Sequence, residues 1–250
     1  MTFRTSLCLA EDANGHPTST AVNMISKEGE EVAFRAPFQA QGAVESWLSD
    51  LISHIGDTLR GVLSDSVTSY GEPERDAALK EWLAMYPAQI VSLVSRIWWT
   101  RDVDSAFGMK EEGNQYALRD YNRNQQENLK KLAALVRGEL SPQERRKIIT
   151  LITIEVHARD VVARLVQSGA ENHLVFDWQS QLRYSWDDDT KVCSINIADA
   201  SFTYGYEYIG NCGCLVITPL TDRCCECLWS LLSTFCFFDE ETPLSSVLLW

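Results

Sequence analysis

The sequence has little glycine and little proline, 13 and 7 residues out of 250. A collagen-like repeat or a flexible Gly/Ser linker would contain far more of both. The longest apolar run, residues 227–238, is also too short for the roughly 20 residues that cross a bilayer. Because 45% of the residues are hydrophobic and 23% are charged, these absences indicate a folded globular chain of one large domain or two modest ones.

Positive charge is scarce as well. The chain has 22 lysines and arginines against 35 aspartates and glutamates, a net charge of −13. Residues 169–250 contain 3 basic and 12 acidic residues, so most of the excess lies in the last third. Nucleic acid, anionic membranes and the microtubule surface are negatively charged as well and would repel this chain. We therefore expect none of them to be a direct partner.

Sequence motifs for catalysis are missing too. The chain has no phosphate-loop pattern and no Gly-Lys pair, no GxSxG elbow, no HExxH and no GxGxxG after a strand. We therefore predict no catalytic residue and no nucleotide hydrolysis by the chain alone. The first residues also lack an apolar run of signal-peptide length, so we expect a cytosolic protein with reduced thiols.

Eight cysteines are the one possible source of metal chemistry, and seven of them lie toward the C-terminus. Cys212 and Cys214 are followed by Cys224, Cys225 and Cys227. A Cys-x-Cys pair reaches one tetrahedral zinc ion less readily than the usual wider spacing. We predict no metal site, and keep a zinc-binding protein as an alternative hypothesis.

Three other groups could carry chemistry but favour a structural interpretation. His157 near Asp160 could be an acid–base pair, although a histidine on a bundle helix is usually held by its neighbours. The acidic run 187–189 has no glycine-containing cation loop and is typical of a solvated turn. Trp98 and Trp99 could stack on bases, but a chain this acidic favours core packing.

Apolar residues recur at three- and four-residue steps through the middle of the chain, the pattern of amphipathic helices. We predict helices over residues 44–70, 77–85, from Pro87 onward, over 111–140 with one wet face, and from Ser141 onward. Ser141, Pro142 and Glu144 form a capping box with proline at the first helical position. The turns after it are apolar almost all round, so that helix should lie inside the bundle.

The two ends of the chain differ from this middle. Residues 1–40 are polar and unperiodic and predict a loosely ordered lead-in. After Gly169 the period changes to two, in residues 192–197 and again in Tyr204, Tyr206 and Tyr208. Residues 215–218 are a further strand candidate, and Thr221 or Asp222 could cap a last helix. The fold class is therefore mainly α, an elongated bundle of long helices followed by a small β-containing C-terminal segment.

Four segments resemble dynein heavy chains, in the order and at the spacing of that family. They are YPAQIVSLVSRIWWT (86–100), KIITLITIEVHARDVVARLV (147–166), FDWQSQLRYSWDDDTKVC (176–193) and FTYGYEYIGNCGCLVITPLTDRC (202–224). MISKEGEEVAF, from Met24, and GAVESWLSDL, from Gly42, resemble the region upstream. The resemblance covers residues 22–224 and corresponds to the C-terminal part of the linker and the first residues of the first AAA+ module. The WQSQLR segment is more similar to axonemal than to cytoplasmic dyneins.

This resemblance implies the mechanical element of an ATP-driven, minus-end-directed microtubule motor. In that family the linker is a helical rod that arches over a ring of AAA+ modules, and its swing is the power stroke. The implied partners are the AAA+ ring and, for the family, the intermediate and light intermediate chains; the implied location is the cytoplasm and cytoskeleton, in a cilium axoneme. The implied division is a lead-in (1–40), a helical linker bundle (41–172), the linker end with the start of an AAA+ module (173–224) and a divergent, poorly ordered tail (225–250).

The resemblance also implies a set of adenine contacts. In the family the aligned stretch lies beside the adenine of the first module's nucleotide, and the residues here are Leu215, Val216, Ile217, Thr218, Pro219 and Leu220. Beyond Cys224 the chain departs from the family and supplies no phosphate loop, lysine or hydroxyl for ATP and magnesium. We therefore expect no cofactor in this chain. An alternative is a binding module that docks on AAA+ modules or other dynein subunits through the wet face of residues 111–140.

Overall fold

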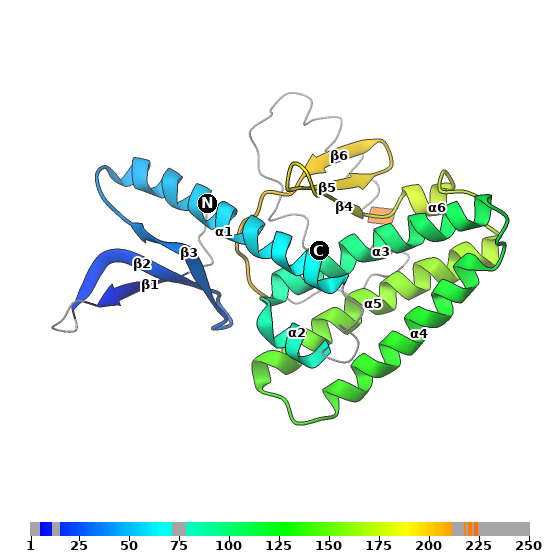
Figure 1. The fold of residues 1–250 in the computed structure, drawn as a ribbon, viewed down its shortest axis with the longest axis horizontal. Coiled ribbons are helices and arrows are strands. Elements are labelled where there is room, and N and C mark those ends of the chain that lie inside the picture. Colours follow the sequence, from blue (N-terminus) through cyan, green and yellow to red (C-terminus); the bar gives the residue numbers. More distant parts are fainter. Residues whose placement is uncertain are drawn as a thin grey trace.

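The computed structural model describes residues 6–11, 16–71, 79–211, 218, 220, 221, 223 and 224. A three-stranded sheet comes first, then a series of helices, then a second three-stranded sheet (Figure 1). The elements are β1 (Ser6–Glu11), β2 (Pro17–Ile25), β3 (Glu31–Gln39), α1 (Val44–Tyr70), α2 (Leu79–Met85), α3 (Ala88–Glu111), α4 (Ala117–Val136), α5 (Pro142–Ser168), α6 (Phe176–Gln179), β4 (Arg183–Asp187), β5 (Val192–Ile197) and β6 (Ala200–Thr203). The prediction of a mainly α fold with some β structure is confirmed at this level.

The N-terminal sheet corrects the prediction for residues 1–40. A loosely ordered lead-in is wrong there, because β1, β2 and β3 form an antiparallel sheet that packs on α1. The buried side chains of the sheet are Ala21, Met24, Val32 and Phe34. The register shifts between Cys8 and Leu9 and again after Ala21. Such bulges interrupt the alternation of buried and exposed residues by which a strand is recognised in a sequence.

The helices follow the apolar pattern with two corrections. α1 and its end at Tyr70 are as predicted. The helix predicted over residues 111–140 is too long, because α3 extends to Glu111 and Gly113, with φ +113°, turns the chain before α4 begins. Glycine adopts this backbone conformation without steric cost.

The capping box of α5 is present as predicted. The Glu144 amide donates to Ser141 Oγ at 3.2 Å, and the Ser141 amide donates to Glu144 Oε2 at 2.8 Å. Its burial is one-sided, however, since Ile148 and Leu151 are buried whereas Ile149 is exposed. The prediction that this helix is enclosed on all sides is therefore wrong.

Helix α3 is the central element of the helical region. It packs on α1, α4 and α5, and strand β4 lies against it (Figure 1). One hydrophobic cluster surrounds its N-terminal half and includes the first sheet, α1 and β5. A second surrounds its C-terminal half and includes Trp178 of α6. The helical region is elongated because the two clusters follow one another along α3.

The second sheet is antiparallel in the order β4-β5-β6. In β5 the residues Cys193, Ile195 and Ile197 are buried and alternate with half-buried ones, which confirms the predicted period of two. The strand pattern of the three tyrosines is not realised, because β6 ends at Thr203. Among the helices of the described ranges, none is both long and apolar enough to cross a membrane.

Candidate functional site

The site begins with a break between two helices. α2 ends at Met85 and α3 begins at Ala88, and Pro87 between them favours an extended residue before it. A break of this kind leaves carbonyl oxygens at the end of the first helix and amide groups at the start of the second without helical partners. Both sets are directed at the same place, so a pair of opposite charges can satisfy them together.

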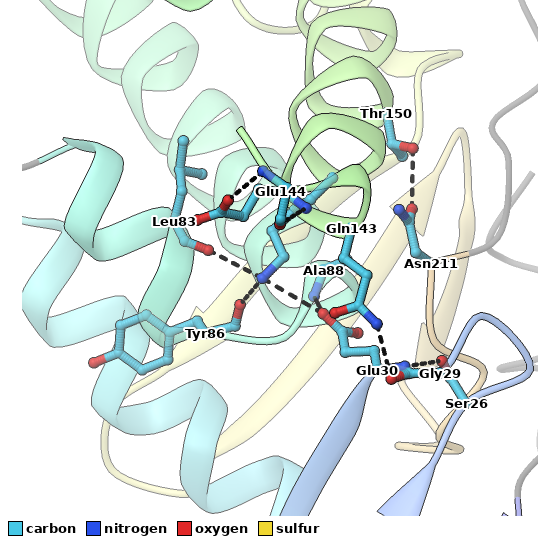
Figure 2. A network of polar contacts seen from close by, with 12 residues as sticks. Ser26, Gly29, Glu30, Leu83, Tyr86, Ala88, Gln143, Glu144, Thr150 and Asn211 are labelled. Atoms are coloured by element: carbon cyan, nitrogen blue, oxygen red, sulfur yellow. Dashed lines mark hydrogen bonds and ion pairs between the residues drawn. The ribbon is translucent and has the colours of Figure 1, made fainter. Parts of the chain in front are cut away.

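An ion pair between Lys147 and Glu30 fills this role, and Figure 2 labels Glu30 and the residues of the helix break around it, Leu83, Tyr86 and Ala88. Lys147 Nζ donates to the carbonyl oxygens of Leu83 at 3.0 Å and Tyr86 at 2.6 Å, and lies 3.4 Å from Glu30 Oε1. Glu30 Oε1 accepts from the Ala88 amide at 2.9 Å. The side chains are only 11% and 16% exposed. A cation at the end of α2 and an anion at the start of α3 also match the helix dipoles.

Glu30 reaches this position from the turn between β2 and β3, residues 26–30. The Gly29 amide donates to Ser26 O at 3.0 Å, and the Glu30 amide donates to Ser26 Oγ at 3.1 Å. Gln143 Nε2, in the first turn of α5, donates to Gly29 O at 3.0 Å. The turn is therefore held against α5, and its carboxylate is directed at the helix break (Figure 2).

Next to this turn runs a stretch of chain, residues 204–210, that we call the strap. All of it is described, and it has neither helix nor strand conformation. Most of it is nevertheless buried: Tyr204, Tyr206 and Tyr208 are only 3–5% exposed, while Gly205 is exposed and Glu207 half-buried. Because burying unpaired backbone groups is costly, its amide and carbonyl groups need partners.

Gln89, in the first turn of α3, pairs three of these backbone groups and one side-chain hydroxyl of the strap. Its Nε2 donates to the Tyr204 hydroxyl at 2.8 Å and to Glu207 O at 2.7 Å. Its Oε1 accepts from the amides of Ile209 at 2.8 Å and Gly210 at 3.2 Å. The side chain is 2% exposed. A single buried amide thus contacts the strap from its first residue to its last.

The strap also contacts the β2–β3 turn. The Tyr208 hydroxyl lies 3.2 Å from Glu30 O and 3.3 Å from Glu30 Oε2. Gly210 has φ +76°, and a Cβ there would lie 2.3 Å from Ser26 Cβ. Beyond the strap, Thr150 Oγ1 donates to Asn211 Oδ1 at 3.0 Å (Figure 2). We refer to the helix break, the turn and the strap together as the polar joint.

The electrostatics of the joint favour a structural role. Burial raises the pKa of the Tyr204 and Tyr208 hydroxyls, and the negative charge of Glu30 raises that of Tyr208 further. Burial also raises the pKa of the Cys193 thiol to about 12. Cys193 adjoins the strap, because its backbone amide donates to the Tyr206 hydroxyl. These groups stay protonated near neutral pH, and they act as hydrogen-bonding and packing groups rather than as acids or bases.

The predicted adenine contacts fall only partly in the described chain. Leu215, Val216, Ile217 and Pro219 lie outside the described residues, so their role stays a prediction. Thr218 and Thr221 exchange hydrogen bonds, with the Thr218 amide donating to Thr221 Oγ1 at 2.7 Å and the Thr221 amide to Thr218 Oγ1 at 3.3 Å. Thr218 therefore caps this helical turn, and the prediction of a cap at Thr221 is wrong; Asp222, the other predicted cap, lies outside the described residues.

The remaining candidate groups do not converge on the joint. Asp160 accepts two hydrogen bonds from Arg159 of the same helix. Asp187 accepts from the Asp189 amide and from the Thr190 hydroxyl, which lower the pKa of its carboxyl. The acidic run is thus a solvated hairpin turn, as predicted. Trp99 packs edge-on against Trp178, with ring centroids 5.0 Å apart, which confirms its role in the core.

The cysteine group is largely untested. Of its five members only Cys224 is among the described residues, where it is an exposed free thiol. The described part of the chain contains no group of three His, Cys, Asp or Glu side chains placed to hold a metal ion. The divergent tail, residues 225–250, also lies outside the described residues, so the prediction that it is poorly ordered stays a prediction.

No sequence pattern identifies the three polar residues at the centre of the joint. Glu30, Gln89 and Lys147 are each a common polar residue and belong to no motif. One signal was available for Gln89, which is a lone amide within the apolar stretch that starts α3. A polar side chain on the buried stripe of a helix requires a partner. The sequence does not say that the partner lies more than a hundred residues away.

Comparison with known proteins identifies relatives of the chain. No protein-family model matches the chain. Over 213 residues, 85% of the chain, it is 47% identical to dynein axonemal heavy chain 9 of Homo sapiens. It is 45% identical over 214 residues to the ciliary dynein beta chain of Tripneustes gratilla, and 42% identical over 219 residues to the flagellar outer arm dynein beta chain of Chlamydomonas reinhardtii. The chain spans 5% of the length of each of these relatives.

Proposed function

We propose that this chain, which is homologous to axonemal dynein heavy chains over most of its length, is the C-terminal part of a dynein linker, a mechanical element of a microtubule motor. The observation that carries the proposal is the identity of 42–47% across 85–88% of the chain to heavy chains from an animal cilium, a human axoneme and an algal flagellum. The location that fits is the cytoskeleton of a cilium axoneme.

The fold supports a mechanical role on physical grounds. Helix α3 runs through both hydrophobic clusters, and close-packed interiors transmit displacement with little compression. At one end of this helix the polar joint holds the strap, which leads toward residues 212–224, where the resemblance to the first AAA+ module begins. A rod joined rigidly to the next module would move with it.

In this proposal the motor's ATPase belongs to the rest of the heavy chain. The chain contributes no catalytic residue, and contacts with adenine through residues 215–220 are its only part in nucleotide binding. Its partners are the AAA+ ring and, through the assembled complex, the intermediate and light intermediate chains. Direct contact with the microtubule, nucleic acid or membrane is not expected from a net charge of −13.

A chimeric motor tests the proposal. Residues 22–211 of this chain replace the homologous segment of an axonemal dynein heavy chain, and the purified motor is assayed for ATP hydrolysis and for microtubule gliding. We expect both activities to be retained, whereas an unrelated helical segment of the same length should abolish gliding. A chimera that hydrolyses ATP but does not move microtubules would contradict the mechanical role.

The chain alone provides the second test. The purified 250-residue protein should not hydrolyse ATP; turnover above that of buffer would contradict the assignment of catalysis to the rest of the heavy chain. Its alternative role as a binding module is tested by mixing it with intact axonemal dynein. Stable association that alters the gliding velocity of the intact motor would favour the binding module over the linker segment.

A further inference from the structure

Gln89 holds the strap with its whole hydrogen-bonding capacity. A primary amide has two N–H donors and a carbonyl oxygen with two lone pairs. Here both donors are used, by Tyr204 and Glu207, and both acceptor sites are used, by the amides of Ile209 and Gly210. No other natural side chain except asparagine, which is one methylene shorter, offers two donors and two acceptor sites on one planar group.

The geometry of these four bonds matters for force. They start from one side chain and end at three backbone positions and one hydroxyl, spread over the length of the strap. A pull on the chain beyond Gly210 reaches the bonds of Gly210 and Ile209 first, and all four must break before the strap separates from α3. Networks of buried hydrogen bonds of this kind are stronger than separate pairs.

The backbone next to Gln89 is also held by hydrogen bonds. It follows Ala88, whose amide is bound by Glu30, and Glu30 is bound in turn by Lys147 of α5. Thr150, also on α5, holds Asn211 just after the strap. The strap is thus tied through Gln89 to the point where α2, α3, α5 and the first sheet meet.

We infer that Gln89 is the positioning residue that couples the helical rod to the chain leading into the next module, so that the swing of one is transmitted to the other. This inference rests on the proposed function. In the motor, loss of Gln89 leaves ATP turnover intact and uncouples it from movement, because the strap can then slide or lift from α3 under load.

The first experiment measures the strap itself by native-state hydrogen exchange on the 250-residue chain. In Gln89→Leu the amides of Ile209 and Gly210 lose their acceptor, and we expect them to exchange on the order of 10- to 100-fold faster. The amide of Ile195 in β5 should be unaffected. Gln143→Leu is the matched control, because it removes one hydrogen bond of the same joint but none to the strap. Unchanged exchange at Ile209 and Gly210 would overturn the inference.

The second experiment measures coupling in the chimeric motor described above. We expect Gln89→Leu to lower the gliding velocity several-fold while the ATPase rate stays within about twofold of the unsubstituted chimera. The control Gln125→Leu replaces a buried amide of α4 that makes no hydrogen bond to the strap, and should change neither. Gln89→Glu, which keeps the acceptor oxygen and loses both donors, should give an intermediate velocity and guards against a folding defect of the leucine variant. Normal gliding by Gln89→Leu despite its faster amide exchange would overturn the coupling role. So would a fall of gliding velocity and ATPase rate that is equally large in Gln89→Leu and in the control variant.

The two proposals can fail separately. If the unsubstituted chimera does not move microtubules, the linker function is wrong and the coupling role fails with it. Hydrogen exchange on the isolated chain still decides whether Gln89 holds the strap. If the unsubstituted chimera moves and the Gln89 variants move equally well, only the coupling role is wrong.

Discussion

The two ends of α3 are held in different ways. At its N-terminus, Ala88 and Gln89 are fixed by directed hydrogen bonds to Glu30 and to the strap. From its middle toward its C-terminus, Trp99 and Phe107 pack against Trp178, with ring centroids 5.0 and 6.3 Å apart. Packing brings elements together, whereas hydrogen bonds also determine the path of the chain. The end that leads toward the strap combines packing with a network of such hydrogen bonds centred on Gln89.

We call the C-terminal end of α3, with the second hydrophobic cluster around it, the distal end. The difference predicts that the distal end contributes more to the free energy of unfolding, whereas the joint determines the path of the strap. Trp178 is fully buried, and its Nε1 donates to Asp104 Oδ1 at 3.0 Å. We expect Trp178→Ala to lower the free energy of unfolding by about 3–5 kcal/mol, because it leaves a cavity and removes the indole hydrogen bond to the Asp104 carboxyl. Urea unfolding followed by circular dichroism measures this.

The control lies two residues away on the same short helix. Phe176 is exposed, and Phe176→Ala should change the free energy of unfolding by less than about 0.5 kcal/mol. Equal losses in the two variants would show that α6 as a whole, rather than the buried indole, stabilises this end.

The ion pair of the joint gives the next largest effect. Lys147→Met should cost about 3 kcal/mol, since it leaves the Glu30 carboxylate buried without its cation and two carbonyl oxygens without a donor. Glu30→Gln should cost less, because the amide oxygen can still accept from Ala88.

A double-mutant cycle separates the pair from its surroundings. The double variant should be about 1–2 kcal/mol more stable than the sum of the two single losses predicts, because neither charge is then left alone. Strict additivity would mean that each side chain stabilises the helix break on its own.

Gly210 distinguishes backbone geometry from side-chain contacts. Gly210→Ala should cost about 1–3 kcal/mol, because its φ of +76° strains an alanine and the added Cβ meets Ser26 at 2.3 Å. A Cβ added at Gly108, near the other end of α3, would meet no atom of the described residues within 4 Å. Gly108→Ala should therefore be neutral or stabilise by up to about 1 kcal/mol. A loss at Gly108 equal to that at Gly210 would contradict the argument from the strap.

The sequence predicted local structure well and the joint poorly, for one physical reason. The limits of α1, the cap of α5 at Ser141 and Glu144, and the alternation in β5 each depend on residues close together in the chain. The hydrogen bonds of Gln89 join residues 115–121 positions apart, and those of Glu30 to Ala88 join residues 58 apart. No local pattern encodes such pairs. The resemblance to dyneins identified the family, but it did not predict these contacts.

Alkaline pH provides the smallest and most selective test of the comparison. Burial raises the pKa of the Cys193 thiol from its ordinary 9.0 to about 12, and raises that of the Tyr204 and Tyr208 hydroxyls as well. Below pH 9 the folded and unfolded chains are equally protonated at Cys193, so the full stability is present. Above pH 9 the unfolded thiol ionises while the folded one does not, and stability is lost until the pH reaches about 12.

Near the C-terminal end of α3, burial raises the pKa of the Tyr121 hydroxyl as well, so alkaline loss begins there only above the ordinary tyrosine value of 10.0. Among the described residues, that end has no buried thiol, and it has a carboxyl that titrates in acid. Burial raises the pKa of the Asp104 carboxyl, so its contribution is complete only in acid, below the ordinary value of 3.8, and is already lost as the pH rises through the raised value. Ionisation of the Cys193 thiol in the unfolded chain should therefore lower the free energy of unfolding by about 1 kcal/mol from pH 8 to 10. Amide exchange should rise more at Ile209, in the strap, than at Val162, in the second hydrophobic cluster. Cys193→Ala should reduce this slope. An equal rise in exchange at both amides would mean that the joint and the distal end open together, and that α3 does not separate them.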